Sequence, residues 1–302
     1  MVKQTKNNKR LKNKKNKKNK MTKKICAPHV QNDPISCFSR KSLLEMIKMY
    51  NEKTNNSSQK IFKNISPENL EKKTRKQLHQ ALEEKMKSSC NDEQCWVNNV
   101  LKTKQFNKEL KPVYPKKWKK NKNTWLTTYD IENVLKQYQT KHNDFLFLGA
   151  VPIDFDSRVY SGNCVSENIC NLNVEKMKQN GKTKLGIVFN LDKHDQPGSH
   201  WIAMYCDFSK GELNFFDSYA EEPPTEVIVL MERLQQQNEE LGVQTLIINN
   251  EKVHQHKNSE CGMYCIYFIV ERLEGRPMSY FNNNRIADDN VEKKRTLFFY
   301  KD

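Results

Sequence analysis

Apolar residues in the second half of the chain fall in short runs that predict strands mixed with helices. Strands rich in Ile, Val, Phe and Tyr, bounded by Gly, Asp and Pro, are predicted at 145–153, 184–191, 199–208, 212–217 and 244–249. Helices are predicted at 129–139, 226–241 and 261–273, and the last is strongly apolar with Asn258 or Ser259 as its N-cap. Because strands and helices do not alternate strictly, the pattern predicts an α+β fold with a central mixed sheet flanked by helices.

The first half of the chain is more polar and predicts a different organisation. Residues 1–24 are a Lys- and Asn-rich run with few apolar residues, and we expect this arm to be disordered when free. Helical signals follow at 42–50 and after Ser66, which is a suitable N-cap because Pro67 fits the first helical position. We therefore expect three parts: the basic arm 1–24, a small helical N-terminal domain at 25–122 and the main domain at 123–302.

The positive charge of the chain is concentrated in the arm. The whole chain has 52 Lys and Arg against 36 Asp and Glu, a net charge of +16. Twelve of the basic residues lie in 1–24, which has no acidic residue, so the rest of the chain has 40 basic against 36 acidic residues. Flexible cations neutralise phosphates without reading base sequence. Non-specific DNA binding by residues 1–24 is therefore one hypothesis, and a targeting or solubilising tail is the other.

Some functional classes are disfavoured by what the sequence lacks. The longest apolar stretch, 261–270, is shorter than the roughly 18 residues of a membrane span. The N-terminus has no apolar secretory core, so we expect neither secretion nor membrane association. There is no HExxH motif, no phosphate-binding glycine loop and no dinucleotide fingerprint. We expect no cofactor and no bound metal.

The nine cysteines are an odd number in a chain without a signal peptide, which indicates reduced thiols in an intracellular compartment rather than a disulfide framework. Cys90 and Cys95 have a spacing seen in zinc sites, but no second pair with a matching spacing follows. Ordinary free cysteines are therefore favoured over zinc. Cys261 has a different setting, because it begins a predicted apolar helix.

Cys261 is the candidate nucleophile. Unpaired N–H groups and the positive end of a helix stabilise a thiolate, whereas Cys265, one turn later, is expected to pack in the core. His200 begins one predicted strand and Asp217 ends the next, so the short connection between them predicts that the two residues lie together. An acid that orients an imidazole, and an imidazole that takes the thiol proton, complete a nucleophilic triad. Gln255 is a candidate oxyanion donor beside the Cys261 N–H.

The order of these residues resembles that in the adenovirus proteinase and ubiquitin-like-protein-specific protease superfamily of cysteine proteases. The matching elements are His200-Trp201, Phe216-Asp217-Ser218, and Gln255 followed by Glu260-Cys261-Gly262, within about residues 125–280. The chain is most similar to the polyprotein-processing thiol proteases of asfarviruses and giant viruses. The resemblance implies a papain-like or adenain-like core, with Cys261 as nucleophile, His200 as general base and acid, Asp217 as its orienter and Gln255 in the oxyanion hole. It also implies that Trp201 walls a narrow cleft for Gly-type residues.

Two positions differ from the pattern of the superfamily. Gln255 lies between His254 and His256, and Glu260 stands where many relatives have aspartate. Neither difference removes a group that the chemistry needs. The N-terminal domain has no clear counterpart in cellular deconjugating enzymes, which favours the viral branch.

We therefore predict a viral thiol endopeptidase that cleaves structural precursor proteins after small residues such as Gly, in the virion and at assembly sites in the infected-cell cytoplasm. Three alternatives stay open. The same triad serves removal of a ubiquitin-like modifier from host proteins, or protein acetylation with acetyl-coenzyme A as donor. The third alternative is a non-enzymatic module whose basic arm binds nucleic acid, which the complete His, Asp, Gln and Cys set disfavours.

Overall fold

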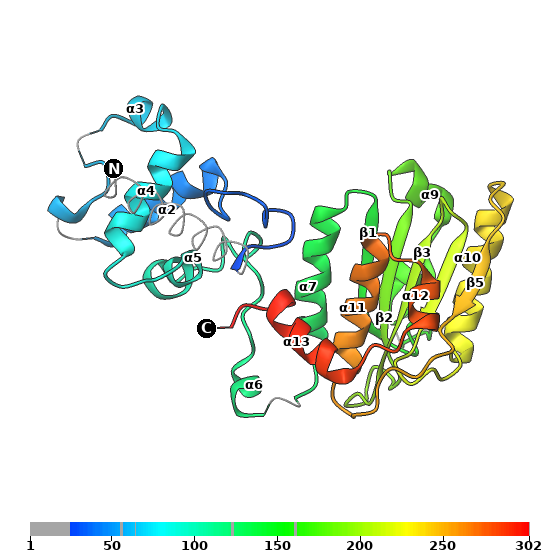
Figure 1. Cartoon of the computed structure of the whole chain (residues 1–302). Helices are drawn as coiled ribbons and strands as arrows, with labels where there is room; N and C mark the ends of the chain where they lie inside the picture. The colour runs from blue at the N-terminus through cyan, green and yellow to red at the C-terminus, as the bar shows by residue number, and fades with distance from the viewer. Residues whose placement is uncertain (1–24, 55–56, 64, 122–123, 160–161, 302) are drawn as a thin grey trace, which may run out of the picture. The chain divides into compact units, whose positions relative to one another are not determined.

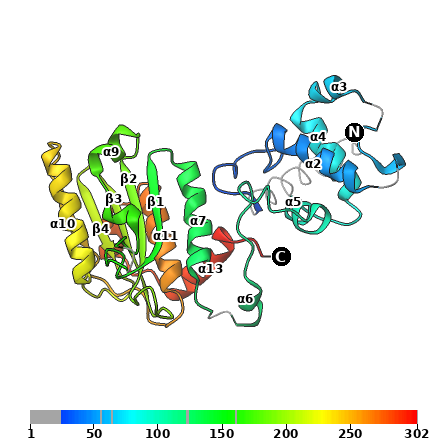
Figure 2. The same cartoon turned by 180° about the vertical axis from the view of Figure 1, so that it is seen from behind.

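The computed structural model describes residues 25–54, 57–63, 65–121, 124–159 and 162–301 (Figures 1 and 2). The predicted arm 1–24 and the predicted domain boundary at 122/123 lie outside the described residues. The chain divides into two compact units, and the division falls between Val113 and Tyr114. Residues 114–121 therefore belong to the second unit, where Trp118 packs edge-on against Phe299.

The N-terminal unit is helical. Its helices are α2 (Arg40–Lys53), the 3₁₀ turn η1 (Ser57–Gln59), α3 (Pro67–Glu71), α4 (Arg75–Met86), α5 (Glu93–Cys95) and the π-helical η2 (Trp96–Leu101). Ser66 caps α3 as predicted, through a hydrogen bond from the Asn69 N–H. The helical stretch predicted after Ser66 is nevertheless two helices, because Thr74 forms a capping box with Gln77 and starts α4. The apolar faces of these helices, including Leu43, Ile47, Leu78 and Leu82, are buried.

The disulfides correct the prediction that the cysteines are reduced thiols. Six of the nine cysteines form the pairs Cys26–Cys37, Cys90–Cys95 and Cys164–Cys170. The partners are 11, 5 and 6 residues apart, and local turns bring their Cα atoms to 5.1, 5.5 and 6.5 Å, which a disulfide can bridge. The prediction rested on compartment and on ligand spacing, and neither carries information on these turns. Cys206, Cys261 and Cys265 are free and buried.

A five-stranded mixed sheet forms the centre of the second unit, which confirms the predicted α+β fold. The strands lie in the order β1 (Phe145–Pro152), β2 (Lys184–Asn190), β3 (Trp201–Asp207), β4 (Glu212–Phe216) and β5 (Leu246–Asn249). The inner pairs β2–β3 and β3–β4 are antiparallel, and the outer pairs β1–β2 and β4–β5 are parallel. All five strands fall within the predicted segments.

Helices cover both faces of this sheet (Figures 1 and 2). The helices of the second unit are α6 (Lys116–Lys120), α7 (Thr128–Lys141), α8 (Glu167–Cys170), α9 (Val174–Gln179), α10 (Thr225–Glu240), α11 (Cys261–Leu273), α12 (Met278–Asn283) and α13 (Asp288–Phe298). Side chains of β3 alternate between the two cores. Ala203 and Tyr205 pack in the core that contains α7 and α11, whereas Met204 and Cys206 pack in the core that contains α9 and α10. Among the described residues, no helix has the length and apolar character needed to cross a bilayer.

Candidate active site

Cys261 is the first residue of α11, the most apolar helix of the fold. Twelve of the thirteen residues of α11 are buried, and Cys261 itself is 2% exposed. The predicted N-cap, Asn258 or Ser259, is wrong, because the cap position is Glu260 and no side chain bonds the first-turn N–H groups. The first turn thus keeps its positive end for the sulfur.

A buried ion pair fixes the start of α11. The Glu260 carboxylate accepts hydrogen bonds from Arg295 Nη2 at 2.7 Å and from Nε at 3.1 Å. Burial raises the pKa of Glu260, and the hydrogen bond with Arg295 acts in the opposite direction. Arg295 also lies over the Trp118 ring and donates to the Thr124 carbonyl. The longer acid at position 260 therefore serves to reach α13.

His200 and Asp217 meet at one edge of the antiparallel centre of the sheet. His200 directly precedes β3, Asp217 directly follows β4, and Ala203 pairs with Phe216 in register. His200 Nε2 lies 2.7 Å from Asp217 Oδ1, and both side chains are largely buried. The backbone of Asp217 is held on both sides by the Asn250 amide, with distances of 2.8 and 2.7 Å. The sheet and Asn250 therefore position the acid that orients the imidazole.

The surroundings of His200 favour its charged form. Burial on its own lowers the pKa of the imidazole, but hydrogen bonds with Asp217 and Cys261, and their negative charge, raise it to about 9. Since Nε2 faces Asp217, Nδ1 is the ring nitrogen left for the thiol. A protonated imidazole beside the sulfur stabilises a thiolate at neutral pH.

Tyr219 links the imidazole to Gln255. Its ring lies 5.0 Å from the His200 ring, centroid to centroid, and its hydroxyl accepts a hydrogen bond of 2.9 Å from Gln255 Nε2. The same Nε2 donates to the Lys257 carbonyl, and Gln255 Oε1 accepts from the Ser218 hydroxyl at 2.8 Å. The amide is thus held at both ends at the edge of the site.

The two histidines beside Gln255 lie away from the site. His254 is fully buried between Phe216 and Tyr264, and its Nδ1 accepts from the Ile286 N–H. Burial, and then the charges of Lys252 and Arg285, lower the pKa of His254 to about 4, so it is neutral. His256 is exposed. Gln255 is the residue of the three that lines the cleft described next.

One cleft of about 320 Å³ contains the candidate residues. His200, Asp217, Gln255 and Cys261 line it together with Trp125. Trp201 does not line this cleft but a second hollow of about 530 Å³, of which Trp125 is also a wall. Trp125 is therefore a wall of the cleft that contains Cys261, whereas Trp201 is a wall of the neighbouring hollow.

Glycine at position 262 permits close packing beside these tryptophans. A Cβ atom there would lie 3.0 Å from Leu126 Cβ and 3.3 Å from Trp201 Cδ1. Both indoles are also held by backbone carbonyls: Trp201 Nε1 donates to Leu126, and Trp125 Nε1 donates to Asn258. Trp125 in the cleft and Trp201 in the neighbouring hollow are therefore each held in place by a hydrogen bond to the backbone.

Four contributors were not predicted from the sequence as site residues: Tyr219, Asn250, Arg295 and Trp125. Tyr219 is two residues after Asp217, and residues at strand ends gather at one edge of a sheet. Its position in the sequence was therefore a signal that could have identified it. Asn250 and Arg295 act through contacts distant in sequence, for which the sequence alone has no signal. Among the described residues, the one buried group of three metal-ligating side chains, Cys26, Cys37 and Glu93, belongs to the N-terminal unit and not to this cleft.

A mixed sheet, a cysteine at the start of the helix packed on it, and a His–Asp pair at the sheet edge are the features of a papain-like cysteine peptidase. The comparisons with known proteins agree, and the chain is a cysteine-type peptidase. The chain belongs to the family of viral cysteine proteases that includes the cysteine protease of African swine fever virus, and it is 30% identical over 248 residues to that protein from one tick isolate. The match covers 76% of this chain and 90% of the relative.

Other comparisons extend this result. A thiol protease of Acanthamoeba polyphaga mimivirus is 27% identical over 290 residues, which is 91% of this chain and 93% of the relative. A crystal structure of the African swine fever virus protease has a TM-score of 0.65 at 22% identity, and the match covers 93% of this chain and 97% of that one. The similarity in fold to this protease therefore extends over nearly the whole of the chain. No protein-family model matches the chain.

Proposed function

We propose that this peptidase is a thiol endopeptidase with Cys261 as nucleophile, His200 as general base and acid, Asp217 as the orienter of His200 and Gln255 as an oxyanion donor. One observation carries the proposal. The His200 imidazole is hydrogen-bonded to Asp217 at 2.7 Å and lines one cleft together with Cys261, which stands at the positive end of a buried helix. This is the arrangement that nucleophilic catalysis by a thiol requires.

The reaction proceeds in two acyl transfers. His200 takes the thiol proton, and the Cys261 sulfur attacks the scissile carbonyl carbon. The Cys261 N–H stabilises the oxyanion, and Gln255 Nε2 joins it by giving up one of its bonds to Tyr219 or Lys257. His200 then protonates the leaving amine. Water attacks the remaining thioester with His200 as base and releases the acid product.

For the substrate, we propose structural precursor proteins of the virus, cleaved after Gly-type residues during particle assembly in the virion and infected-cell cytoplasm. Two features support a small residue before the scissile bond. The bulky indole of Trp125 lines the cleft with Cys261, and Trp201 packs against Gly262, the residue that follows Cys261. The relatives in the family are proteases of large DNA viruses.

A second candidate substrate is a ubiquitin-like modifier. The related proteins of some African swine fever virus isolates bear the name SUMO-1 cysteine protease. Such modifiers and Gly-type precursor sites present similar small residues to the cleft, so the same geometry serves both. The choice between them needs an experiment.

The test compares the two substrate classes with one enzyme preparation. Purified enzyme and its Cys261→Ala variant are incubated with the structural precursors of the virus and, separately, with host modifier precursors. New N-termini are mapped by mass spectrometry. We expect cleavage after Gly in the viral precursors by the enzyme and none by the variant. Cleavage of the modifier precursors alone would reject the endopeptidase proposal in favour of deconjugation.

Replacing Asp217 by Asn is expected to shift the pH dependence of catalysis. Burial lowers the pKa of His200, and the hydrogen bond with Asp217 is the strongest of the contributions that nevertheless raise it to about 9. Because the active ion pair is lost when His200 deprotonates, activity falls as the pH rises through about 9 in the native enzyme. In Asp217→Asn, this alkaline limb of kcat/KM should move down by about one pH unit or more.

The matched control for Asp217→Asn is Asp154→Asn. Asp154 pairs with His194 at 2.7 Å in the same manner, but His194 is half-exposed and outside the triad. This variant should keep the alkaline limb of the native enzyme. An unmoved limb in Asp217→Asn would show that Asp217 does not set the protonation of His200.

For the arm, we propose attachment to DNA through its twelve basic residues. If about half of these cations neutralise phosphates, the logarithm of the affinity falls with the logarithm of salt concentration with a slope of about −5. Deleting residues 1–24 should flatten this slope while cleavage of a short peptide stays unchanged, because the candidate triad lies after residue 199. An equal slope with and without the arm would reject DNA attachment and leave the hypothesis that the arm is a targeting or solubilising tail.

A further inference from the structure

Ser218 and Tyr219, just after β4, hold the two ends of the Gln255 side-chain amide. The Ser218 hydroxyl donates to Gln255 Oε1 at 2.8 Å, and the Tyr219 hydroxyl accepts from Nε2 at 2.9 Å. The Ser218 carbonyl also accepts from the Gln255 N–H at 2.8 Å. The Tyr219 N–H donates at 3.0 Å to Asp217 Oδ1, the oxygen that contacts His200. Backbone and side chain of Gln255 are therefore both fixed to the segment that carries the acid.

The directions of these hydrogen bonds show how the Gln255 amide is turned. The Lys257 carbonyl accepts from Gln255 Nε2 and, at 3.0 Å, from the Tyr219 hydroxyl. Because a carbonyl oxygen only accepts, the end of the amide that faces it must be the NH₂ group. Burial, and then the negative charge of Cys261, raise the pKa of Tyr219, so the hydroxyl keeps its proton at neutral pH. Tyr219 gives this proton to the Lys257 carbonyl, and its oxygen accepts the second N–H of Gln255.

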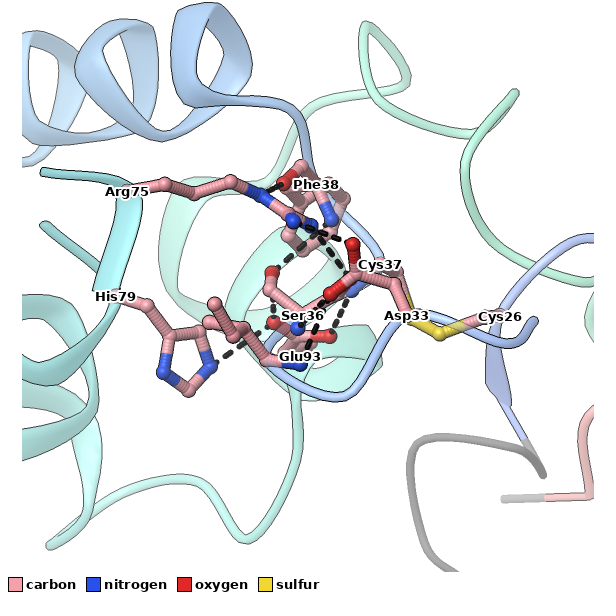
Figure 3. The surroundings of a disulfide bond; sticks show 9 residues. Cys26, Asp33, Ser36, Cys37, Phe38, Arg75, His79 and Glu93 are labelled. Atoms are coloured by element: carbon pink, nitrogen blue, oxygen red, sulfur yellow. Dashed lines mark hydrogen bonds and ion pairs between the residues drawn. A yellow bond between two sulfur atoms is a disulfide. The ribbon is translucent and has the colours of Figure 1, made fainter. Parts of the chain in front are cut away.

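The ring of Tyr219 contributes less to this arrangement than its hydroxyl does. An aromatic ring beside a histidine that is paired with a carboxylate also occurs in the N-terminal unit. There His79 Nε2 lies 3.0 Å from Glu93 Oε1 (Figure 3), and the ring centroids of His79 and Trp96 are 5.2 Å apart. The Tyr219 and His200 centroids are 5.0 Å apart. Ring contact is therefore ordinary packing beside a buried histidine, whereas the hydroxyl, which Trp96 lacks, has its own partner in the cleft.

We propose that Tyr219 is a positioning residue of the oxyanion hole. Its hydroxyl holds one Gln255 N–H at the cleft in the resting enzyme and releases it to the oxyanion that forms when Cys261 attacks. The inference rests on the proposed function, in which Gln255 is an oxyanion donor. Release leaves none of these donors unpaired, because the hydroxyl and the other N–H keep their bonds to the Lys257 carbonyl. A donor aligned in advance needs little reorganisation when the oxyanion forms.

The test is a double-mutant cycle of Tyr219→Phe and Gln255→Ala in the full-length chain, with kcat and KM measured on a Gly-Gly peptide substrate. Tyr219→Phe keeps the ring beside His200, and the Lys257 carbonyl keeps Gln255 as a donor, so we expect the variant to fold. Its kcat should fall by about 10-fold with KM unchanged, as for the loss of one hydrogen bond. In the Gln255→Ala background the same change should alter kcat by less than about 2-fold, because the hydroxyl then has no amide to hold.

A control and a pH profile separate this role from others. Tyr129 on α7 is 77% exposed, and Tyr129→Phe should behave like the native enzyme. The alkaline limb of kcat/KM should stay in place in Tyr219→Phe, because the hydroxyl acts on Gln255 and not on His200. A native kcat, an equal loss in the Gln255→Ala background, a rise in KM alone or a shifted limb would each overturn the proposal and leave the proposed function standing. Turnover that persists in Cys261→Ala would reject both.

Discussion

Cys261→Ser and His200→Ala are each expected to reduce kcat/KM by on the order of 10⁴-fold or more, because a nucleophile and its base act as one unit. The oxygen of serine is a far weaker nucleophile at neutral pH, and the imidazolium that stabilises the thiolate is lost in His200→Ala. The double variant should be no worse than the single ones. The measurement is peptide hydrolysis followed under saturating and limiting substrate.

Two controls accompany this prediction. Thermal unfolding of each variant should stay close to that of the native enzyme, since Cys261→Ser changes one buried atom. Cys265→Ala should keep its turnover, because Cys265 is buried one turn along α11 and burial raises the pKa of its thiol well above the usual value. Substantial hydrolysis by Cys261→Ser would remove Cys261 from the role of nucleophile.

Gln255→Glu is expected to lower kcat by on the order of 10²–10³-fold with little change in KM, as for the loss of one oxyanion donor. The substitution keeps the size of the side chain and removes the N–H groups that now contact Tyr219 and Lys257. The carboxylate also repels the developing oxyanion. Steady-state kinetics separates kcat from KM.

His256→Ala is the matched control for Gln255, because His256 is adjacent but exposed and outside the cleft. It should turn over substrate like the native enzyme. If Gln255→Glu kept full activity and His256→Ala lost it, the assignment of Gln255 as the oxyanion donor would be wrong. An increase in KM alone would instead assign Gln255 to substrate binding.

The strands and helices of the second unit were predictable because each carries its own apolar pattern. The five strands and α7, α10 and α11 begin and end within a few residues of the predicted segments. The closeness of His200 and Asp217 followed from one short hairpin. A hairpin and a helix start are local features, and local features can be inferred from a single sequence.

Contacts between distant segments were not predictable. The cap of α11 is a case, because Glu260 occupies it to meet Arg295 on α13, so a preference for Ser or Asn at caps was overridden. The disulfides were missed for a different reason: their partners are only 11, 5 and 6 residues apart, but the number of cysteines and the expected compartment carry no information on the local turns that join them.

The Glu260–Arg295 pair also gives the order of synthesis a role. Arg295 follows Cys261 by 34 residues, so the ribosome adds it about 2–7 s after the cysteine at the usual rates of elongation. Until then Glu260 has no counter-charge, and burying an unpaired carboxylate is costly. The first turn of the catalytic helix is therefore stabilised only when both residues of the pair are present, so completion of the site depends on a helix that follows it in the chain.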